Sequence, residues 1–345
     1  MKNLLLLVLF LTIGLSCAKN SETPSGSFLT GDGVFLINEG NFTAGNGSLS
    51  FYSYDSLKIY NDLFEKVNGR PLGDVPNSME LKNDLAYIIV NNSGKIEVIK
   101  TSTLESVNTI SGIISPRNIA FTSSAKAYVT SMYSDSLVVI NLNSNTISGY
   151  ISLRRSSESI IIAGEKAYAA NWVGGSEVMV IDTNSDKVVD SIAVGIEPES
   201  MVLDKNGMLW VLCNGGWARE NYAELDAINT ATGEVVKKIV FPSKQESPSC
   251  LKINGEGDTL YYLETGVRRM SITASVLPSD PFIPESGHYF YKLGIDPVST
   301  YIFVTDAVDY QQNGHLLCFS SEGTPVKSLD AGIIPGSMCF KTAAK

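Results

Sequence analysis

An internal repeat constrains this chain of 345 residues more than any other feature. Seven short segments share one pattern, in which an aromatic or branched apolar residue opens a run that ends in polar turn residues. They begin at Phe35, Tyr87, Tyr128, Tyr168, Trp210, Tyr261 and Ile302. The spacing runs from 40 residues (Tyr128 to Tyr168) to 52 residues (Phe35 to Tyr87). Seven units of roughly forty residues predict a β-propeller, in which each unit forms one blade of a ring.

Each unit repeats the same order of four strand-like segments. A second segment follows the one above, and it starts at Ser48, Lys95, Ser136, Glu177, Glu224 and His315. After a tight turn and a third segment comes a fourth with a Pro-x-Ser-Met-like start, at Pro76, Pro116, Pro198, Pro248 and Pro335, with Ser157 and Phe290 in place of the other two prolines. The sixth unit departs from the pattern near Ser271. Alternating small and β-branched residues favour strands buried between neighbouring blades.

The two ends of the repeat predict how the ring closes. The chain enters the repeat with the segment that belongs second in a blade, and it finishes with PGSMCF, which belongs first. We therefore expect the C-terminal strand to join the first blade, which removes two free sheet edges. The predicted fold is all-β, a seven-bladed propeller of four-stranded antiparallel blades over residues 28–345.

The N-terminus has the features of an export signal. Residues 1–16 combine one lysine with an apolar run from Leu4 to Ile13, which is too short to span a membrane and predicts a signal peptide. The sequence Gly14-Leu15-Ser16-Cys17 is similar to a lipobox, so Cys17 is the expected lipid anchor, and an ordinary secreted protein is the alternative. Residues 17–27 are small and polar, which predicts a flexible, lipidated tether.

Composition limits the partners and the redox chemistry. A net charge of −10 without a basic cluster argues against nucleic-acid binding. Four further cysteines lie in apolar segments without metal-ligand spacing, and we expect buried free thiols in preference to disulfides at Cys213, Cys250, Cys318 and Cys339. The two histidines, His288 and His315, are too few to favour a histidine-built metal site.

The order of strands sorts the connections between the two faces of the ring. Neighbouring strands of a blade are antiparallel, so successive connections alternate between the two faces of the ring. The loop after the second strand, counted outward from the centre of the ring (the strand that contains Tyr87, for example), therefore shares one face with the connection between blades, and we call this the loop face. Its segments are longer and hold many aromatic residues, and aromatics on loops of a rigid scaffold indicate a binding surface. The alternative is that single rings fold down over the core. The candidate ligand-binding residues are Phe42, Arg117, Tyr133, Asn171, Trp172, Trp217, Tyr222, Arg268, Tyr310 and Gln311.

Two segments carry a more specific family resemblance. NEGNFTAGNGSLSFY (Asn38–Tyr52) and the stretch from DAVDYQQNG to AGIIPGSMCF (Asp306–Phe340), together with the lipobox, resemble the BtuG-type surface lipoproteins of Bacteroidetes, within the YVTN-type seven-bladed propellers. The resemblance covers nearly the whole chain after the signal. It implies capture of vitamin B12 and other corrinoids at the outer membrane, facing the cell exterior, and delivery to a TonB-dependent transporter of the BtuB type.

The candidate residues suit a corrinoid, which is the one bound molecule we expect. A corrin is a broad disc with apolar faces and a fringe of amides. Aromatic rings can cover the faces, while Asn, Gln and Arg side chains pair with the amides. Arg268 could meet the phosphate of the nucleotide loop through charge-assisted hydrogen bonds.

Other functions fit the same pattern. Aromatic platforms with amide groups also suit glycans or peptides, and the loop face could instead meet a protein partner. A metal-dependent lactonase would need ligands, for which Glu39, Asp306 and Asp309 are weak candidates that could bind Ca²⁺; turn-forming, solvated carboxylates are the simpler interpretation. The sequence has no histidine cluster and no paired nucleophile and base, so we expect a binding protein and not an enzyme.

Overall fold

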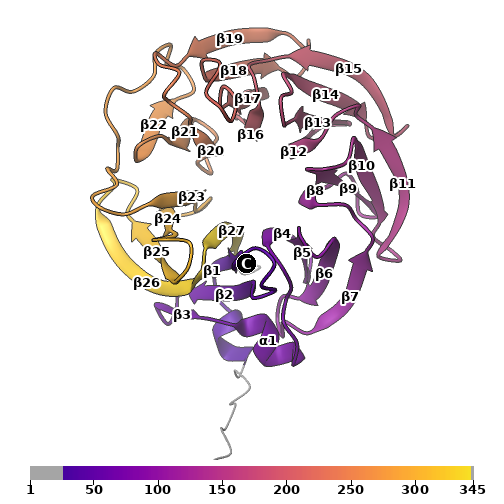
Figure 1. Cartoon of the computed structure of the whole chain (residues 1–345), viewed down its shortest axis with the longest axis vertical. Helices are drawn as coiled ribbons and strands as arrows, with labels where there is room; N and C mark the ends of the chain where they lie inside the picture. Colours follow the sequence, from indigo (N-terminus) through magenta and orange to yellow (C-terminus); the bar gives the residue numbers. More distant parts are fainter. Residues whose placement is uncertain (1–25, 343–345) are drawn as a thin grey trace, which may run out of the picture.

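The computed structural model describes residues 26–342, which form a closed ring of seven β-sheets (Figure 1). The predicted signal peptide, Cys17 and most of the tether lie outside the described residues. In each sheet the segment with the Pro-x-Ser-Met-like start is the innermost strand, and in blades two to seven the chain runs outward from there. Within residues 26–342 no helix has both the length and the apolar character needed to cross a membrane.

Each blade is a sheet whose strands follow one another from the channel outward. Blade one contains β27 (Pro335–Lys341), β1 (Gly33–Asn38), β2 (Ser48–Ser53) and β3 (Lys58–Tyr60); blade two contains β4 (Pro76–Lys82), β5 (Leu85–Val90), β6 (Lys95–Lys100) and β7 (Ser106–Ser111). Blade three contains β8 (Pro116–Phe121), β9 (Lys126–Ser131), β10 (Ser136–Asn141) and β11 (Thr146–Ser152); blade four contains β12 (Ser157–Ala163), β13 (Lys166–Asn171), β14 (Glu177–Asp182) and β15 (Lys187–Ala193). Blade five contains β16 (Pro198–Leu203), β17 (Met208–Cys213), β18 (Glu224–Asn229) and β19 (Val235–Val240). Blade six contains β20 (Ser249–Ile253), β21 (Thr259–Leu263) and β22 (Val267–Ser271), and blade seven contains β23 (Phe290–Ile295), β24 (Ile302–Asp306), β25 (Asn313–Phe319) and β26 (Pro325–Ile333). A short 3₁₀ helix η1 (Gly26–Leu29) precedes blade one, and helix α1 (Leu63–Asn68) covers the outside of blade one.

The ring closes as the sequence predicts. The C-terminal strand β27 pairs antiparallel with β1, from Gly33 opposite Lys341 to Asn38 opposite Pro335. The strand order of blade one is therefore β27-β1-β2-β3, and the first and last strands of the repeat share one sheet. The channel-facing edge of β1, which would otherwise lack a partner, is covered by this pairing.

The core consists of seven apolar clusters, one at each junction between neighbouring blades. The cluster between blades one and two, for example, packs Phe35 and Phe51 against Met79 and Ile88. Fully burying an apolar side chain of this size contributes about 1.5–3 kcal/mol, so these junctions hold the ring together. The four described cysteines lie buried and free in such junctions, which confirms the prediction of free thiols.

Blade six differs from the other six blades because it has three strands in place of four. The turn after β21 is short, so Arg268 and Arg269 belong to strand β22, which corrects the prediction that Arg268 lies on a loop. The segment after β22 contains three prolines, Pro278, Pro281 and Pro284. Proline cannot donate a ladder hydrogen bond, which explains why this segment forms no fourth strand.

Candidate functional site

Backbone hydrogen bonds tie together the two kinds of connection that were assigned to the loop face. In four blades, the residue that follows the strand second from the channel donates its N–H to the carbonyl of a residue just before the innermost strand of the same blade. This bond joins Asn91 to Val75 (2.8 Å), Met132 to Ser115 (3.0 Å), Trp172 to Ser156 (3.0 Å) and Asn214 to Glu197 (3.1 Å). Both kinds of connection therefore lie on one face of the ring, at the mouth of the channel.

Aromatic side chains are concentrated on this face. Among the described residues, seven aromatic residues are exposed, and five of them lie on loop-face segments: Phe42, Tyr133, Trp217, Tyr222 and Tyr289. Trp217 is 93% exposed, which is unusual for an indole. The other two are Tyr150 on the outermost strand β11 and Tyr301 in the turn between β23 and β24. Exposed aromatics gathered on one face indicate an interaction surface.

A β-bulge recurs where each innermost strand begins. The pairing register shifts there in all seven blades, for example between Pro76 and Ser78 and between Phe290 and Lys292. A bulge re-aims a side chain that regular pleating would direct elsewhere. The residues at the second position of the Pro-x-Ser-Met-like start form the bulge ring: Asn77, Arg117, Glu158, Glu199, Ser249, Tyr291 and Gly336.

Backbone strain accompanies the bulges. In four blades the residue directly before the innermost-strand proline has a left-handed conformation, with φ of 51° at Val75, 41° at Ser115, 52° at Glu197 and 50° at Ile334. For a β-branched residue this region is an outlier, with a cost of about 1–3 kcal/mol. Such strain persists only where the surrounding structure fixes it. The N–H donors described above hold the carbonyls of Val75, Ser115 and Glu197, and the N–H of Glu39 holds that of Ile334 (2.9 Å).

A buried ion pair lies within the bulge ring. Arg117 donates from Nε to Glu158 Oε2 (2.7 Å) and from a terminal nitrogen to Oε1 (2.9 Å), and the two side chains are only 14% and 12% exposed. The indole of Trp172 lies over the guanidinium, with 5.8 Å from its Cζ to the ring centroid. Trp172 is therefore a half-buried neighbour of the ion pair, and Arg117 already has both a carboxylate and an aromatic partner.

A second constellation closes the ring between blades seven and one. The hydroxyl of Tyr291 lies 3.0 Å from both carboxylate oxygens of Glu39. A Cβ on Gly336 would lie 2.9 Å from Glu39 Oε1, so the glycine leaves room for this carboxylate. Burial raises the pKa of Glu39, and this rise is opposed by Lys292, by the Tyr291 hydroxyl and by Arg117. Burial would by itself lower the pKa of Lys292, but Cys250, Tyr291 and Glu39 raise it, so the ammonium stays charged.

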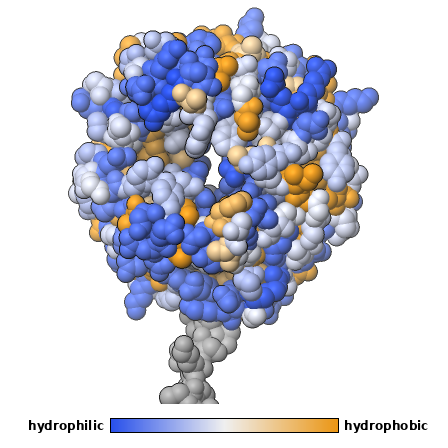
Figure 2. Space-filling model, in the orientation of Figure 1, coloured by the Kyte–Doolittle hydropathy of each residue, from blue (hydrophilic) through white to orange (hydrophobic). Residues whose placement is uncertain are grey.

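The channel below the mouth is narrow and polar. It holds a cavity of about 130 Å³ lined by Asn77, Asn118, Glu158, Glu199, Lys252, Lys292 and several serines. Side chains link neighbouring innermost strands around it, since Ser337 Oγ donates to Asn77 O (2.7 Å) and Asn77 Nδ2 to Arg117 O (2.7 Å). Figure 2 shows the ring hollowed at its centre. The channel has room for water or a small ion, while a large ligand would have to lie across its mouth.

Two polar groups beside the mouth have no partner. The side chain of Asn171 is 1% exposed, and neither its oxygen nor its nitrogen makes a hydrogen bond. The indole N–H of the adjacent Trp172 is also buried without an acceptor. Buried polar groups are rarely left unsatisfied, so this pair is suited to bind a trapped water.

Other predicted site residues lie apart from the mouth or serve the protein itself. Arg268 is buried, and its guanidinium bonds to Glu264 Oε2 (2.8 Å), to Glu264 O (3.0 Å) and to Thr265 Oγ1 (3.2 Å). Its position on β22 corrects the predicted loop placement, and its guanidinium is engaged by the protein itself. Tyr310 is half-buried between Tyr289 and Tyr291, at 5.5 and 5.6 Å between ring centroids, whereas Gln311 is exposed.

The three carboxylates proposed as weak calcium ligands do not converge. Glu39 accepts from Tyr291; Asp306 accepts from His288 Nδ1 (2.7 Å) and from the N–H of Tyr289 (3.1 Å) and of Val308 (2.9 Å). Asp309 caps its own turn through the N–H groups of Gln311 and Gln312. In the described part of the chain, no three His, Cys, Asp or Glu side chains are grouped to hold a metal ion. The simpler interpretation of turn-forming carboxylates fits Asp309.

Sequence reasoning missed most of the bulge ring. Arg117 was identified, but Glu158, Glu199 and Tyr291 were not, although they occupy the same position one residue after the start of each innermost strand. The signal was present as the variable second letter of the Pro-x-Ser-Met pattern. A charged or aromatic residue at that letter, in an otherwise small and apolar strand, indicates a side chain that faces the channel.

Comparison with solved structures finds the same fold at low sequence identity. A quinonprotein alcohol dehydrogenase-like protein from Bacteroides thetaiotaomicron has a TM-score of 0.68 and 17% identity over 90% of this chain and 78% of that one. A protein from Bacteroides fragilis with the provisional name 6-phosphogluconolactonase has a TM-score of 0.68 and 13% identity over 91% of this chain and 99% of that one. A protein of unknown function from Desulfotomaculum acetoxidans has a TM-score of 0.67 and 12% identity over 91% of this chain and 100% of that one. These likenesses show the fold alone.

Comparison with curated proteins found no match. A family profile does match, and it covers residues 32–333, from the first strand of blade one to the end of β26. This range includes the loop-face segments and all the innermost strands except β27. The chain thus belongs to the family described as "Domain of unknown function (DUF5074)".

Proposed function

We propose that this protein is a binding protein that captures a large, flat ligand across the mouth of the channel on the loop face. The observation that carries this proposal is the placement of exposed aromatics: five of the seven in the described chain lie on loop-face segments. Rings held on the loops of a rigid scaffold can cover an apolar ligand face at a low cost in conformational entropy.

The ligand class we propose is a corrinoid such as vitamin B12. The resemblance of Asn38–Tyr52 and Asp306–Phe340 to BtuG-type lipoproteins supports this choice. The loop face also offers groups for the amide fringe of a corrin, among them the exposed Gln311. The 130 Å³ channel is far too small for a corrin, so the disc would lie across the mouth.

The proposed setting is the outer surface of the outer membrane. It rests on the sequence of the N-terminus, where Cys17 follows a lipobox-like motif, and on the family resemblance. A lipid anchor at Cys17 would hold the propeller at the membrane, above a TonB-dependent transporter of the BtuB type that receives the ligand. No catalytic step is assigned to the protein.

A glycan is the second candidate ligand. The indole of Trp217, at 93% exposure, is a flat platform of the kind that stacks on sugar rings. Its loop also contains polar groups held by neighbours, since Arg219 donates to Gln245 O (2.5 Å) and Lys244 to Glu220 O (2.8 Å).

Calorimetric titration with cyanocobalamin tests the proposal. We expect one-to-one binding that weakens at least tenfold in Trp217→Ala and in Tyr133→Ala, because hot-spot aromatics contribute about 2 kcal/mol or more. Tyr150→Ala is the matched control, since this exposed tyrosine lies on the outer strand β11, and its binding should be unchanged.

Two results would count against corrinoid capture. The absence of heat with both cyanocobalamin and cobinamide at high protein concentration would exclude the ligand class, and a positive glycan array on the same sample would replace it. A loss of affinity in Tyr150→Ala equal to that in Trp217→Ala would instead place the binding surface away from the mouth.

A further inference from the structure

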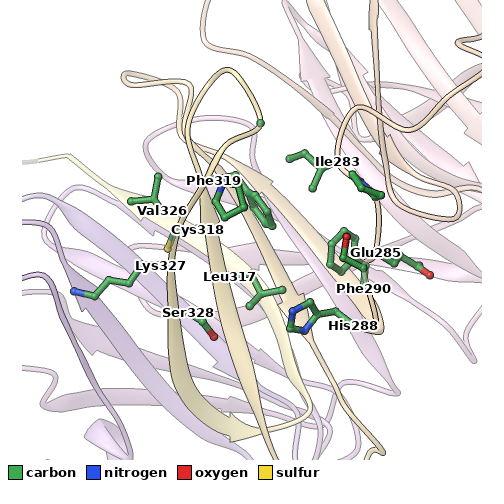
Figure 3. Close-up of a pocket in the computed structure, with 14 residues that line it drawn as sticks. Ile283, Glu285, His288, Phe290, Leu317, Cys318, Phe319, Val326, Lys327 and Ser328 are labelled. Carbon is green, nitrogen blue, oxygen red and sulfur yellow. The ribbon is translucent and has the colours of Figure 1, made fainter.

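A cavity lies where blade six lacks its outermost strand. Residues 272–289 replace that strand, and their only ladder contact among the described residues is the bridge between Val267 and Ile283. Between this segment and strands β25 and β26 of blade seven is a cavity of about 480 Å³ (Figure 3). The size is within the range of small-molecule sites and several times that of the central channel.

The walls of this cavity are mostly apolar and include several rings. Ile283 and Phe290 lie on one side, and Leu317 and Phe319 of β25 face them across the cavity (Figure 3). Phe290 and Phe319 meet edge to face at 6.4 Å, while the imidazole of His288 stacks on Phe290 at 6.4 Å with an interplanar angle of 20°. A flat aromatic ligand would continue this set of ring contacts.

One hydrogen-bond acceptor is oriented at the rim of the cavity. His288 Nδ1 lies 2.7 Å from Asp306 Oδ2, and Asp306 is 4% exposed and held by two backbone N–H groups. An ionised carboxylate can only accept, so Nδ1 carries the proton and donates it. Nε2 of the neutral imidazole is then an acceptor, and it is available to a hydroxyl or N–H group of a ligand.

The charges around the cavity disfavour an anion. Glu285 lines it together with His288, and the buried carboxylate of Asp306 lies directly behind the imidazole. The ammonium of Lys327, the lysine that lines the cavity, donates to Leu57 O at 2.5 Å in blade one. An anionic ligand would therefore meet one carboxylate without a nearby free cation, whereas a neutral one would not.

We propose that this cavity is a second ligand site, separate from the mouth, for a neutral, flat aromatic molecule of one or two rings that donates a hydroxyl or N–H hydrogen bond to His288 Nε2. The site arises from the break in the repeat at blade six. It does not depend on the identity of the ligand at the mouth.

Histidine NMR of the full-length protein gives a direct test, because the chain has two histidines and the second, His315, lies outside the cavity lining. The probe is indole, and indene is its counterpart without an N–H donor. We expect indole to shift the Nε2 resonance of His288 and to leave that of His315 unchanged. Indene should bind roughly two- to tenfold more weakly, as expected for one hydrogen bond.

Two variants test where indole binds and whether His288 supplies the hydrogen bond. Val326→Trp fills the cavity from an exposed position on β26, and Val189→Trp on β15 is its matched control, since these valines are 53% and 57% exposed. Indole binding should be lost in the first and kept in the second. His288→Phe keeps a ring in place but should make indole and indene bind equally.

Three results with indole and indene would overturn the proposal. They are an indole titration that shifts neither histidine or both alike, indole binding that survives Val326→Trp, and equal affinity for indole and indene in the unmodified protein. Tighter binding of indole-3-acetate than of indole would likewise contradict a site for neutral molecules.

Discussion

The mouth of the channel and the perimeter cavity are built in opposite ways. At the mouth, the same bulge occurs in all seven blades, and polar side chains at this position form a buried ion pair and link neighbouring strands. The cavity between blades six and seven exists because one strand is missing, and its walls are apolar with one oriented imidazole. The regular part of the repeat thus forms a polar channel, and the irregular blade six forms an apolar cavity.

The difference shows where stability and adaptability are expected. A network of buried charges tolerates little change, because each partner compensates another. An apolar cavity lacks such partners, so its lining can change with smaller effects on folding. Substitutions at the mouth, each matched with a control elsewhere, can break or sharpen this contrast.

Removing the central cation of the mouth should have the largest effect on stability. Arg117→Met leaves Glu158 buried without a partner, and breaking one side of a buried pair costs about 3–5 kcal/mol. Urea denaturation should show a lower free energy of unfolding by about this amount. Lys100→Met is the control, because its pair with Glu105 is 46% and 56% exposed and contributes about 0–1 kcal/mol. Equal losses of unfolding free energy in the two variants would mean that the buried ion pair at the mouth contributes no more to stability than the exposed pair on the surface.

The two tryptophans of the loop face should respond differently. Trp172→Ala removes a half-buried ring that lies over Arg117, so we expect a loss of about 1–2 kcal/mol in unfolding free energy. Trp217→Ala removes a ring that is 93% exposed, and its effect should stay within about 0.5 kcal/mol. Thermal unfolding of both variants, compared with ligand titration, separates structural aromatics from ligand-contact aromatics. A large loss in Trp217→Ala would place its ring in the core in solution.

The sequence predicted the mouth in outline because a repeat encodes blades, strand order and faces. The starts of second segments at Ser48, Lys95 and Ser136 coincide with the first residues of β2, β6 and β10. Closure through β27 followed from the order of segments alone. Those features depend on alternation and spacing, which a linear sequence displays.

The orientation of single side chains at the mouth could not be predicted in the same way. A bulge shifts the pleat by one residue, so Glu158 and Glu199 line the channel although an alternating pattern does not indicate it. The placement of Arg268 failed for a related reason, because the turn after β21 spans only residues 264–266 and β22 begins before this arginine. The cavity depends on a strand that does not form; the departure of the sixth unit from the repeat near Ser271 and the prolines of residues 272–289 indicate the break, but they do not predict a cavity.

Glu80, on the innermost strand β4, should make stability depend on pH. Although this residue is exposed, the protein around it partly desolvates the carboxylate and raises its pKa to about 7, and Lys252 opposes the rise. A carboxyl with a raised folded-state pKa binds its proton more tightly when folded, so stability is highest below pH 4.5 and falls as the pH rises toward 7. Glu80→Gln should remove this fall, which we expect to stay below about 1 kcal/mol because water reaches the side chain.

Melting temperatures measured between pH 4 and 8 check this prediction. Glu105→Gln is the control, because the pKa of the exposed Glu105 is lowered, first of all by its hydrogen bond to Lys100. Its contribution therefore has the opposite sign and is lost as the pH falls. Parallel pH profiles for Glu80→Gln and the unmodified protein would show that Glu80 does not titrate in this window.

The smallest expected effect concerns the strain at the mouth. Val75 has φ of 51°, so Val75→Gly relieves a left-handed β-branched residue but adds freedom to the unfolded chain. These opposing contributions are each about 1 kcal/mol, and the free energy of unfolding should change by less than about 0.5 kcal/mol. Val240→Gly, on the unstrained outer strand β19, lacks the relief and should lose about 1 kcal/mol in urea denaturation. If the two variants lose the same amount, Val75 is not strained in solution, and the bulge ring is held by its side-chain network alone.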